Sequence, residues 1–389
     1  MSIPFRCIVP KSVQAGGTGT AVTAGPTGIY GHGLLGDYKQ ATSAGPRNVA
    51  HQGGGVWCGA NWDGFSTGDI GTIFASLKDM SNFEKAVDRM QQGFVNFMML
   101  QRAMIHPQGF AALAAFKLDD DGNPGTPEVP VIDVTDPENT RGQYMGISQG
   151  GIMGGSLMAL SPDSDYGVLG VPGMNYSTLL QRSVDSDQYF KSAIGLYSNY
   201  TDLAERPVLL GLMQLLWDRG EANGYANSMT SDPLDNTPPH SVLMRVAFGD
   251  HQVSNYTAEV EARTIGASVY SPALNAGRHW DSDPFLGISQ QTTFPFDGGS
   301  MMVYYDSGPT TFTGSEGQGI GTPPLQNVPP REEWGFGGDP HEHPRRSPDG
   351  IDHAVTFLED GTINSCAAIT PEVGDPTDAH CYANGYTGP

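Results

Sequence analysis

The chain has 389 residues, of which 38% are hydrophobic and 16% charged, and its 20 basic and 42 acidic residues give a net charge of −22. That is enough apolar material for a folded core and too little charge for a disordered chain. The acidic balance excludes nucleic acid and anionic membrane surfaces as expected partners, because phosphate binding requires clustered Lys and Arg.

The first third of the chain predicts two strands and a long helix. "TGIYGHGLLGD" (27–37) reads as a strand that runs into a glycine-rich loop, and "GGGVWCGANWDGFSTGD" (53–69) as a strand followed by an irregular loop. A helix is expected from Ser81, with Ser81 and Glu84 as its capping box. Its apolar residues recur every three or four positions: Phe83, Val87, Met90, Phe94, Phe97 and Met98.

The segment "LDDDGNPGTPEVP" (118–130) predicts a turn. Its acids resemble the start of a calcium loop, but Pro124 stands where such a loop requires glycine, so we expect no calcium there.

The middle of the chain predicts a parallel sheet. "RGQYMGIS" (141–148) is a short strand, "QGGIMGGSLMAL" (149–160) a helix that begins with glycines, and "YGVLGVPG" (166–173) another strand. Strand, turn, helix and strand in quick succession are typical of an α/β fold. Residues 175–240 differ, with an apolar helix over 203–220 and a loop-rich stretch after it, and we expect them to form a cap-like insertion over the site.

The last third predicts two more strands and two helices. We expect a buried strand over 241–250, a helix over 256–267 and a strand over 300–306. A final helix has Ser347 as its N-cap and Pro348 at its first position. We treat 1–389 as one domain whose 360–389 tail is irregular.

The pattern Gly-x-Ser-x-Gly occurs twice, around Ser148 in "GISQG" and around Ser66 in "GFSTG". A serine becomes a nucleophile when a sharp strand-to-helix elbow exposes its hydroxyl, and small residues two positions away let strand and helix approach. Ser148 follows a strand directly and precedes a helix, whereas Ser66 lies well beyond its strand in a loop. We therefore predict Ser148 as the nucleophile.

The loop "GHGLLG" (31–36) follows an earlier strand, and strand ends of a parallel sheet meet at one edge. The backbone N–H groups of Leu34 and Gln149 are the predicted donors to an oxyanion. An ordinary strand-to-helix turn is the alternative interpretation of this loop.

The predicted acid is Asp250, at the end of a late strand, with a helix-capping or turn aspartate as the alternative. His341 is the preferred base, and His343 is the alternative. "HEH" could also hold a metal, but two ligands without a third make that weak, and we predict no metal. His353 falls within the last helix and is expected to pack or face solvent. His32 and His251 are expected to support the site through hydrogen bonds.

Cys7, Cys58, Cys366 and Cys381 form no C-x-x-C pair, which disfavours zinc and permits two disulfides. Cys366 with Cys381 is the expected bridge, because it would fix the tail. Four unpaired cysteines are the alternative.

The motifs "GHGLLG", "GISQGG", "FGDHQV" and "DPHEHP" together resemble the α/β-hydrolase superfamily, and within it bacterial serine esterases and lipases with a His-Gly oxyanion loop and a Ser-Gln-Gly-Gly elbow. The resemblance implies an α/β fold with a mostly parallel central sheet flanked by helices. It also implies an esterase that forms an acyl-enzyme on an uncharged, apolar ester, small or polymeric, and needs no cofactor. Such lipases often have histidine just before the nucleophile, where Ile147 stands here, so esterase is the safer label than lipase.

Other classes remain open from sequence. An acyltransferase or a peptidase would use the same triad, and a non-catalytic binding protein could keep the elbow for packing. The N-terminus "MSIPFRCIVPK" lacks a signal-peptide pattern and no apolar run could span a membrane. With 14 Arg and 6 Lys in an acidic chain, we expect a secreted or periplasmic protein whose signal has been removed, without membrane insertion.

Overall fold

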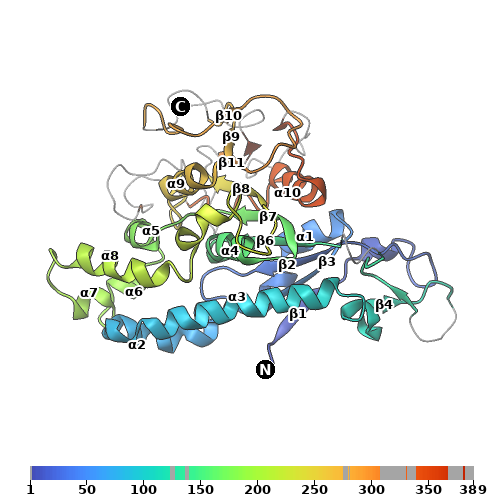
Figure 1. The fold of residues 1–389 in the computed structure, drawn as a ribbon, viewed down its shortest axis with the longest axis horizontal. Coiled ribbons are helices and arrows are strands. Elements are labelled where there is room, and N and C mark those ends of the chain that lie inside the picture. The colour runs from blue at the N-terminus through green and yellow to red at the C-terminus, as the bar shows by residue number, and fades with distance from the viewer. Residues whose placement is uncertain are drawn as a thin grey trace.

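The computed structural model describes residues 2–122, 128–135, 140–274, 279, 281–306, 330, 339–366 and 380–381. Its centre is a ten-stranded sheet in the order β1-β3-β2-β6-β7-β8-β11-β9-β10, with β12 paired to β11 (Figure 1). Among the described strands of this sheet, β1 with β3 and β11 with β12 are the antiparallel pairs, and the other pairs are parallel. The strands are β1 (Phe5–Ile8), β2 (Thr27–Gly31), β3 (Val56–Ala60), β6 (Gly142–Ile147), β7 (Ser164–Gly170), β8 (Ser241–Ala247), β9 (Ser268–Tyr270), β10 (Gln290–Gln291), β11 (Met301–Asp306) and β12 (His380–Cys381).

Helices cover both faces of the sheet. Along β6, Tyr144 packs into the core that contains α3, α4 and α9, while the next residue, Met145, packs into the core that contains α1 and α10. This alternation is what a strand buried on both faces requires, because successive side chains point to opposite sides. The helices are α1 (Ala44–Gln52), α2 (Ile70–Lys78), α3 (Glu84–Ile105), α4 (Gln149–Leu160), α5 (Tyr176–Arg182), α6 (Asp187–Phe190), α7 (Leu196–Asn199), α8 (Arg206–Trp217), α9 (Asn255–Ile265) and α10 (Pro348–Asp360). The predicted fold class, a mostly parallel central sheet flanked by helices, is confirmed.

Residues between β7 and β8 leave the sheet and form α5 to α8. In Figure 1 the helices α6, α7 and α8 lie together with α2 at one end of the molecule. Their apolar residues are not separate from the rest, because Phe190 of α6 and Trp217 of α8 belong to the same hydrophobic core as α3 and α4. A short hairpin of β4 (Lys117–Leu118) and β5 (Val129–Pro130) lies outside the main sheet.

The predicted capping box at Ser81 and Glu84 is wrong. A 3-10 turn over Met80–Asn82 precedes α3, and the Asp79 side chain accepts the Ser81 N–H at 3.1 Å. In the predicted box the Ser81 N–H would donate to the Glu84 carboxylate and the Ser81 hydroxyl would accept the Glu84 N–H. Asp79 instead engages both the N–H and the hydroxyl of Ser81. The predicted cap of α10 is confirmed, since the Ser347 hydroxyl accepts the Gly350 N–H at 2.9 Å.

Both possible disulfides are present. Cys366 is bonded to Cys381, as predicted, and Cys7 is bonded to Cys58 directly across the β1–β3 pair. The alternative of four free cysteines is wrong. The first bridge fixes the antiparallel edge strand, and the second ties β12 to the segment after α10.

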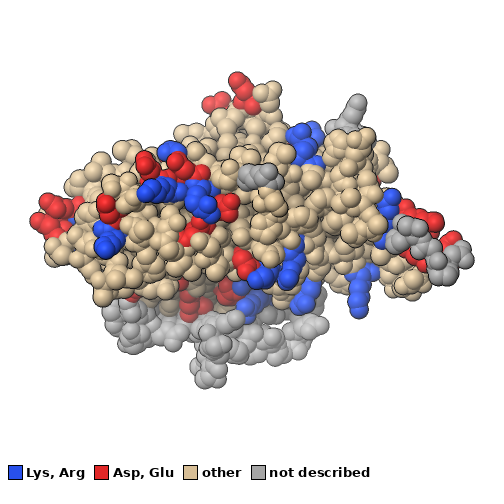
Figure 2. Space-filling view, turned by 90° about the horizontal axis from the view of Figure 1, so that it is seen from below, with Lys and Arg blue, Asp and Glu red and all other residues tan. Residues whose placement is uncertain are grey.

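Basic and acidic side chains are interspersed on the face drawn in Figure 2. Among the ion pairs of the described residues, Arg89 of α3 contacts Asp69 and Arg219 contacts Asp88. None of the helices that the structure describes is long and apolar enough to cross a membrane.

Candidate active site

Ser148 occupies the turn between β6 and α4 in an uncommon backbone conformation. Its φ is 58° and its ψ is −122°, a region that residues with a side chain rarely adopt. The Ser148 N–H donates to the Gly170 carbonyl at 2.9 Å, which holds the turn against β7. This conformation reverses the chain within one residue and directs the serine out of the strand, as a nucleophile elbow does.

Glycine is required on both sides of this serine. A Cβ at Gly146 would lie 2.3 Å from the Gly150 carbonyl oxygen, and a Cβ at Gly150 would lie 2.2 Å from the Gly31 carbonyl oxygen. Neither neighbour can move aside, because both are backbone atoms of packed elements. The glycines therefore let α4 approach the ends of β2 and β6.

Ser66, the centre of the second Gly-x-Ser-x-Gly match, has a structural role. Its φ is −98°, an ordinary extended value, and it forms a capping box with Asp69. The Ser66 hydroxyl donates to the Asp69 carboxylate at 2.7 Å and is buried. It stands at the start of a 3-10 turn (Thr67–Asp69) instead of an elbow.

The loop after β2 lies beside Ser148. A methyl group on Gly33 would be 3.8 Å from the Ser148 Cβ. The Gly33 N–H donates to the Gln40 side-chain oxygen at 3.0 Å. By contrast, neither the Leu34 N–H nor the Gln149 N–H donates to an acceptor within the described residues. Two backbone donors without a protein acceptor, next to a nucleophile, are what an oxyanion site needs.

His32 holds this loop in place. Its Nε2 accepts the Trp62 N–H at 2.8 Å, so the proton is on Nδ1, which donates to the Gly33 carbonyl at 2.8 Å. Burial lowers the pKa of His32 to about 4, which keeps the ring neutral and this tautomer fixed. His32 therefore makes hydrogen bonds of the kind that its sequence position predicts.

Asp250 and His341 are in contact. The His341 Nδ1 lies 2.8 Å from Oδ2 and 3.0 Å from Oδ1 of Asp250. Strand β8 ends at Ala247, and the following turn is closed by the Asp250 N–H to the Ala247 carbonyl. Asp250 Oδ1 also accepts the N–H groups of Gln252 and Val253 at 2.8 and 2.9 Å. The carboxylate is thus fixed by the backbone of its own turn, and the Nδ1 proton of His341 points at it.

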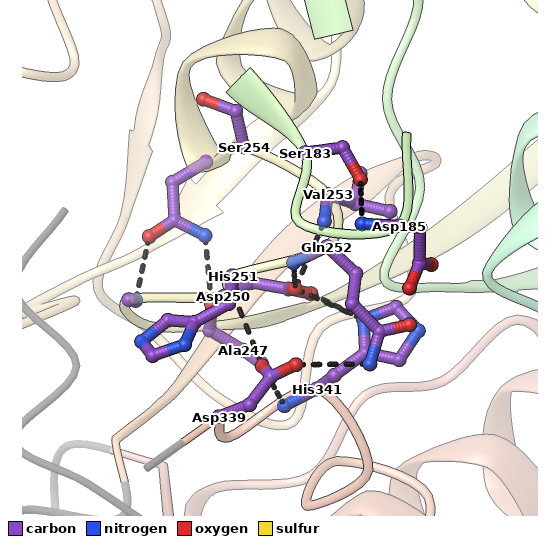
Figure 3. A network of polar contacts seen from close by, with 12 residues as sticks. Ser183, Asp185, Ala247, Asp250, His251, Gln252, Val253, Ser254, Asp339 and His341 are labelled. Carbon is purple, nitrogen blue, oxygen red and sulfur yellow. Dashed lines mark hydrogen bonds and ion pairs between the residues drawn. The ribbon is translucent and has the colours of Figure 1, made fainter. Parts of the chain in front are cut away.

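Sequence analysis missed Asp339, which couples the two loops (Figure 3). Its Oδ1 accepts the N–H groups of His341 and His251, both at 3.1 Å, and its Oδ2 accepts the Gln252 side-chain amide at 2.9 Å. The only feature of the sequence that could have indicated Asp339 is its position two residues before His341. The glycine-rich loop that precedes it, 331–338, lies outside the described residues.

The other histidines occupy supporting positions. The carbonyl of His343 accepts the N–H groups of Arg346 and Ser347 at the entry to α10. The carbonyl of His251 accepts the Val184 N–H, and this bond joins the loop that carries Asp250 to the segment after α5. His353 is packed inside α10, where Nδ1 lies 2.8 Å from the Tyr305 hydroxyl. The imidazole that contacts Asp250 is that of His341.

Burial by itself lowers the pKa of His341, but the Asp250 carboxylate raises it, and Asp339 and Asp185 add to this effect. The net result is a pKa above the ordinary value of histidine. An imidazole that is moderately more basic than usual suits a base that must take a proton near neutral pH.

Ser148 and His341 line one open cavity of about 470 Å³. Ser148 is 8% exposed, so its side chain reaches the edge of this cavity instead of lying in the core. Among the described residues, no hydrogen bond joins these two side chains. Such contacts are often long before substrate binds.

A second cavity, about 50 Å³, adjoins the first and is apolar. Leu34, Asp185 and Tyr189 line both. The remaining walls of the apolar cavity come from the loops after β2 and β3, from α2, from the residue before α3 and from the segment that contains α5 to α8. Phe65, Leu77 and Trp217 are among the lining residues. A reactive serine beside a polar cleft and an apolar recess is an arrangement that can hold an apolar acyl group against a nucleophile.

Asp185 is the second residue that sequence analysis missed. It follows α5, and its carboxylate lies near the ring of His341 (Figure 3). Burial raises the pKa of Asp185 to about 6, His341 opposes this shift, and Asp339 and Asp250 add to it. Nothing in the local sequence distinguishes this aspartate, because only the path of the chain after α5 brings it to the cavity.

We expect Asp185→Asn to move the acidic limb of kcat/KM toward lower pH. A base must be neutral to act, so activity falls as pH drops through the pKa of His341, and removing a nearby negative charge lowers that pKa. The alkaline plateau should change less than about fivefold. Full pH–rate profiles measure both quantities.

Asp187→Asn is the matched control for this prediction, because Asp187 forms an ion pair with Lys191 and does not line the cavity. Its profile should overlay that of the wild type. If the acidic limb of kcat/KM in Asp185→Asn stays in place or moves to higher pH, Asp185 does not raise the pKa of His341.

Two groups of metal-type ligands occur in the described residues, and neither is at this site. His353 lies with Cys366 and Cys381, but these sulfurs form a disulfide. Asp119, Asp120 and Asp121 form the other, at the start of the turn compared above with a calcium loop. Residues 123–127 of that turn lie outside the described residues.

No family model and no curated protein sequence matches this chain. Among solved structures, it is similar to an acylaminoacyl peptidase from Pyrococcus horikoshii, with 12% identity, a TM-score of 0.35 and coverage of 73% of this chain and 33% of that one. It is also similar to acetyl xylan esterase 1 from Thermoanaerobacterium sp. JW/SL YS485, with 16% identity, a TM-score of 0.38 and coverage of 75% of this chain and 73% of that one. For a puromycin-hydrolyzing peptidase from Mycobacterium tuberculosis the identity is 12%, the TM-score is 0.34, and the coverage is 72% of this chain and 31% of that one. The chain thus spans about a third of either peptidase, and at these values the likeness assigns no activity.

Proposed function

We propose that this chain is a serine hydrolase that cleaves carboxylic esters through an acyl-enzyme. The observation that carries the proposal is that Ser148, at a turn with positive φ, and His341, hydrogen-bonded to buried Asp250, both line one cavity. A packed structural serine needs neither this strained backbone nor an imidazole, paired with a buried carboxylate, on the wall of the same cavity.

In the proposed mechanism, Ser148 Oγ attacks the ester carbonyl carbon while its proton passes to His341 Nε2. The N–H groups of Leu34 and Gln149 hold the negative oxygen of the tetrahedral intermediate. His341 then gives the proton to the departing alkoxide, which leaves the acyl group on Ser148. Water reverses these steps, with His341 first as base and then as acid, and releases the carboxylic acid.

Asp250 has a positioning role in this scheme. Its carboxylate accepts the Nδ1 proton of His341, which leaves Nε2 free to accept from Ser148. It also stabilises the imidazolium that forms after proton transfer, since the negative charge lies within hydrogen-bond distance.

The test is covalent labelling with a fluorophosphonate, which reacts only with an activated serine. We expect one label per chain, on Ser148, found by mass spectrometry of the digested protein. Denatured protein is the control and should not react. If the folded wild-type chain stays unlabelled, the proposed hydrolase is wrong and a non-catalytic binding protein is favoured. Product analysis with added alcohol or peptide then separates hydrolysis of esters from acyl transfer and peptide cleavage.

We further propose a short apolar acyl group. The apolar recess measures about 50 Å³, and since a water-sized group needs about 10–15 Å³ by the same measure, it holds roughly four such groups. We expect kcat/KM to be higher for p-nitrophenyl butyrate than for the octanoate. Leu77→Ala should raise the octanoate-to-butyrate ratio at least about fourfold, the effect of burying one further methylene.

Leu286→Ala is the control for chain length, because Leu286 is 68% exposed and outside the recess. Its ratio should equal that of the wild type. A wild type that prefers octanoate, or a ratio unchanged in folded Leu77→Ala, means that the acyl group binds elsewhere.

We also propose that the protein works in an oxidising compartment, outside the cytoplasm. The two disulfides support this, since such bonds persist in secreted and periplasmic settings. Thiol titration of denatured protein isolated from the source should find no free cysteine.

A further inference from the structure

A third cavity lies behind the strand that leads to Ser148. It measures about 10 Å³, which is room for one particle of about the size of water. Met145 and Ile147 of β6 form one wall and α1 another, and the guanidinium-bearing side chains Arg245 and Arg345 complete it with Tyr30. Neither Ser148 nor His341 lines it, so it is separate from the proposed catalytic cavity.

Arg245 is the unusual member of this lining. It is 1% exposed, on β8 in the middle of the sheet, and its Nη1 donates to the Gly350 carbonyl at 2.8 Å. Its buried Nε–H has no acceptor. Among the described carboxylates, none is within ion-pair distance of its guanidinium. A buried charge without a counter-charge is unfavourable, and proteins normally pair it.

The carboxylate of Glu342, the acidic residue beside Arg345, does not pair with Arg245. It contacts Arg345 and, at 3.1 Å, Arg346.

A second polar group of the cavity is the Tyr30 hydroxyl. It is buried near Arg345 and Ser43 and forms no hydrogen bond of good geometry with a described residue. Burial lowers the pKa of Arg245, and the positive charge of Arg345 lowers it further. An arginine nevertheless stays protonated in a protein. The cavity therefore presents a permanent positive charge, an N–H and an O–H, which are groups that bind an anion.

We propose that this cavity binds one small monovalent anion, of the size of chloride, between the Arg245 guanidinium and the Tyr30 hydroxyl. The volume excludes phosphate, sulfate and carboxylate ligands of substrates. Bound there, the anion neutralises Arg245 and stabilises the last three residues of β6, Met145 to Ile147, directly before Ser148. The inference does not depend on the proposed hydrolase activity.

Thermal unfolding in sodium chloride and in sodium gluconate, at equal ionic strength, tests the proposal, because gluconate is too large for the cavity. We expect Tm to rise with chloride by on the order of 3 °C over gluconate, through binding to the folded state alone. In Arg245→Met, which keeps the length of the side chain without its charge, this difference should disappear. Equal Tm values in the two salts for the wild type mean that the occupant is water, and overturn the proposal.

Arg102→Met is the matched control. Arg102 is half-exposed and pairs with Asp163, so its removal leaves the cavity unchanged and should keep the chloride effect. If Arg102→Met also loses the chloride-dependent rise in Tm, the rise comes from general screening of charges by salt, and the proposed anion site is wrong. Should Arg245→Met not fold, crystals of the wild type grown in sodium bromide decide: an anomalous peak between Arg245 and Tyr30 supports the site, and its absence overturns it.

Discussion

Ser148→Ala is expected to lower kcat for p-nitrophenyl butyrate by about 10⁶-fold while leaving the fold intact. The variant removes the oxygen that would form the acyl-enzyme, and no neighbouring hydroxyl stands at the elbow between β6 and α4 to replace it. The change is small, and alanine tolerates the φ of 58° no worse than serine. Circular dichroism and thermal unfolding check the fold, and initial rates with freshly purified enzyme measure the loss.

Ser66→Ala is the matched control, because it carries the same five-residue pattern and the same chemical change. Ser66 caps a 3-10 turn and does not line the catalytic cavity, so we expect full kcat and a loss of stability of about 1 kcal/mol. If folded Ser148→Ala keeps more than a tenth of the wild-type kcat, or if Ser66→Ala loses activity instead, the proposed nucleophile is wrong.

Ser148 and Ser66 show which features of the fold can be predicted from the sequence. The pattern around them is identical in form, and the discrimination came from context: a strand ending at Ile147 and a helix starting at Gln149. That context is local and periodic, so it can be predicted. The same holds for the buried strands, whose apolar runs indicated a sheet covered on both faces.

Contacts across the fold were only partly predictable. Asp250 and His341 are 91 positions apart, and the rule that strand ends meet at one edge of a parallel sheet was enough to bring them together. Whether they act in catalysis stays a prediction. The rule could not choose between His341 and His343, because that choice depends on how Asp339 orients the loop, and a loop has no periodic signal.

Asp185 and Arg245 could not be found from sequence at all. Asp185 reaches the cavity because the chain after α5 folds back, and Arg245 looks like any polar interruption of an apolar strand. The wrong cap at Ser81 has the same origin on a smaller scale, since Asp79 competes for the same backbone donor. In each case the outcome depends on which of several adjacent polar groups is closest in space.

Asp250→Asn is expected to lower kcat by about 10⁴-fold, with little loss of fold. Oδ1 of Asp250 accepts the N–H groups of Gln252 and Val253, so an asparagine would keep its oxygen there. Its NH₂ group would then occupy the place of Oδ2 and face His341 Nδ1, which must become an acceptor. The ring proton moves to Nε2, the nitrogen that should receive the proton of Ser148, and the base is blocked.

Asp339→Asn separates this effect from a general disturbance of the loop. Asp339 accepts from the backbone of His341 and from the Gln252 amide, and it does not touch the imidazole nitrogens. The tautomer of His341 should therefore persist, and we expect kcat to fall no more than about tenfold, the cost of one weakened positioning hydrogen bond. NMR of the ring nitrogens should report Nδ1 protonated in Asp339→Asn and Nε2 protonated in Asp250→Asn. Equal losses in the two variants, or an unchanged tautomer in Asp250→Asn, would mean that the carboxylate holds the loop and does not set the state of the base.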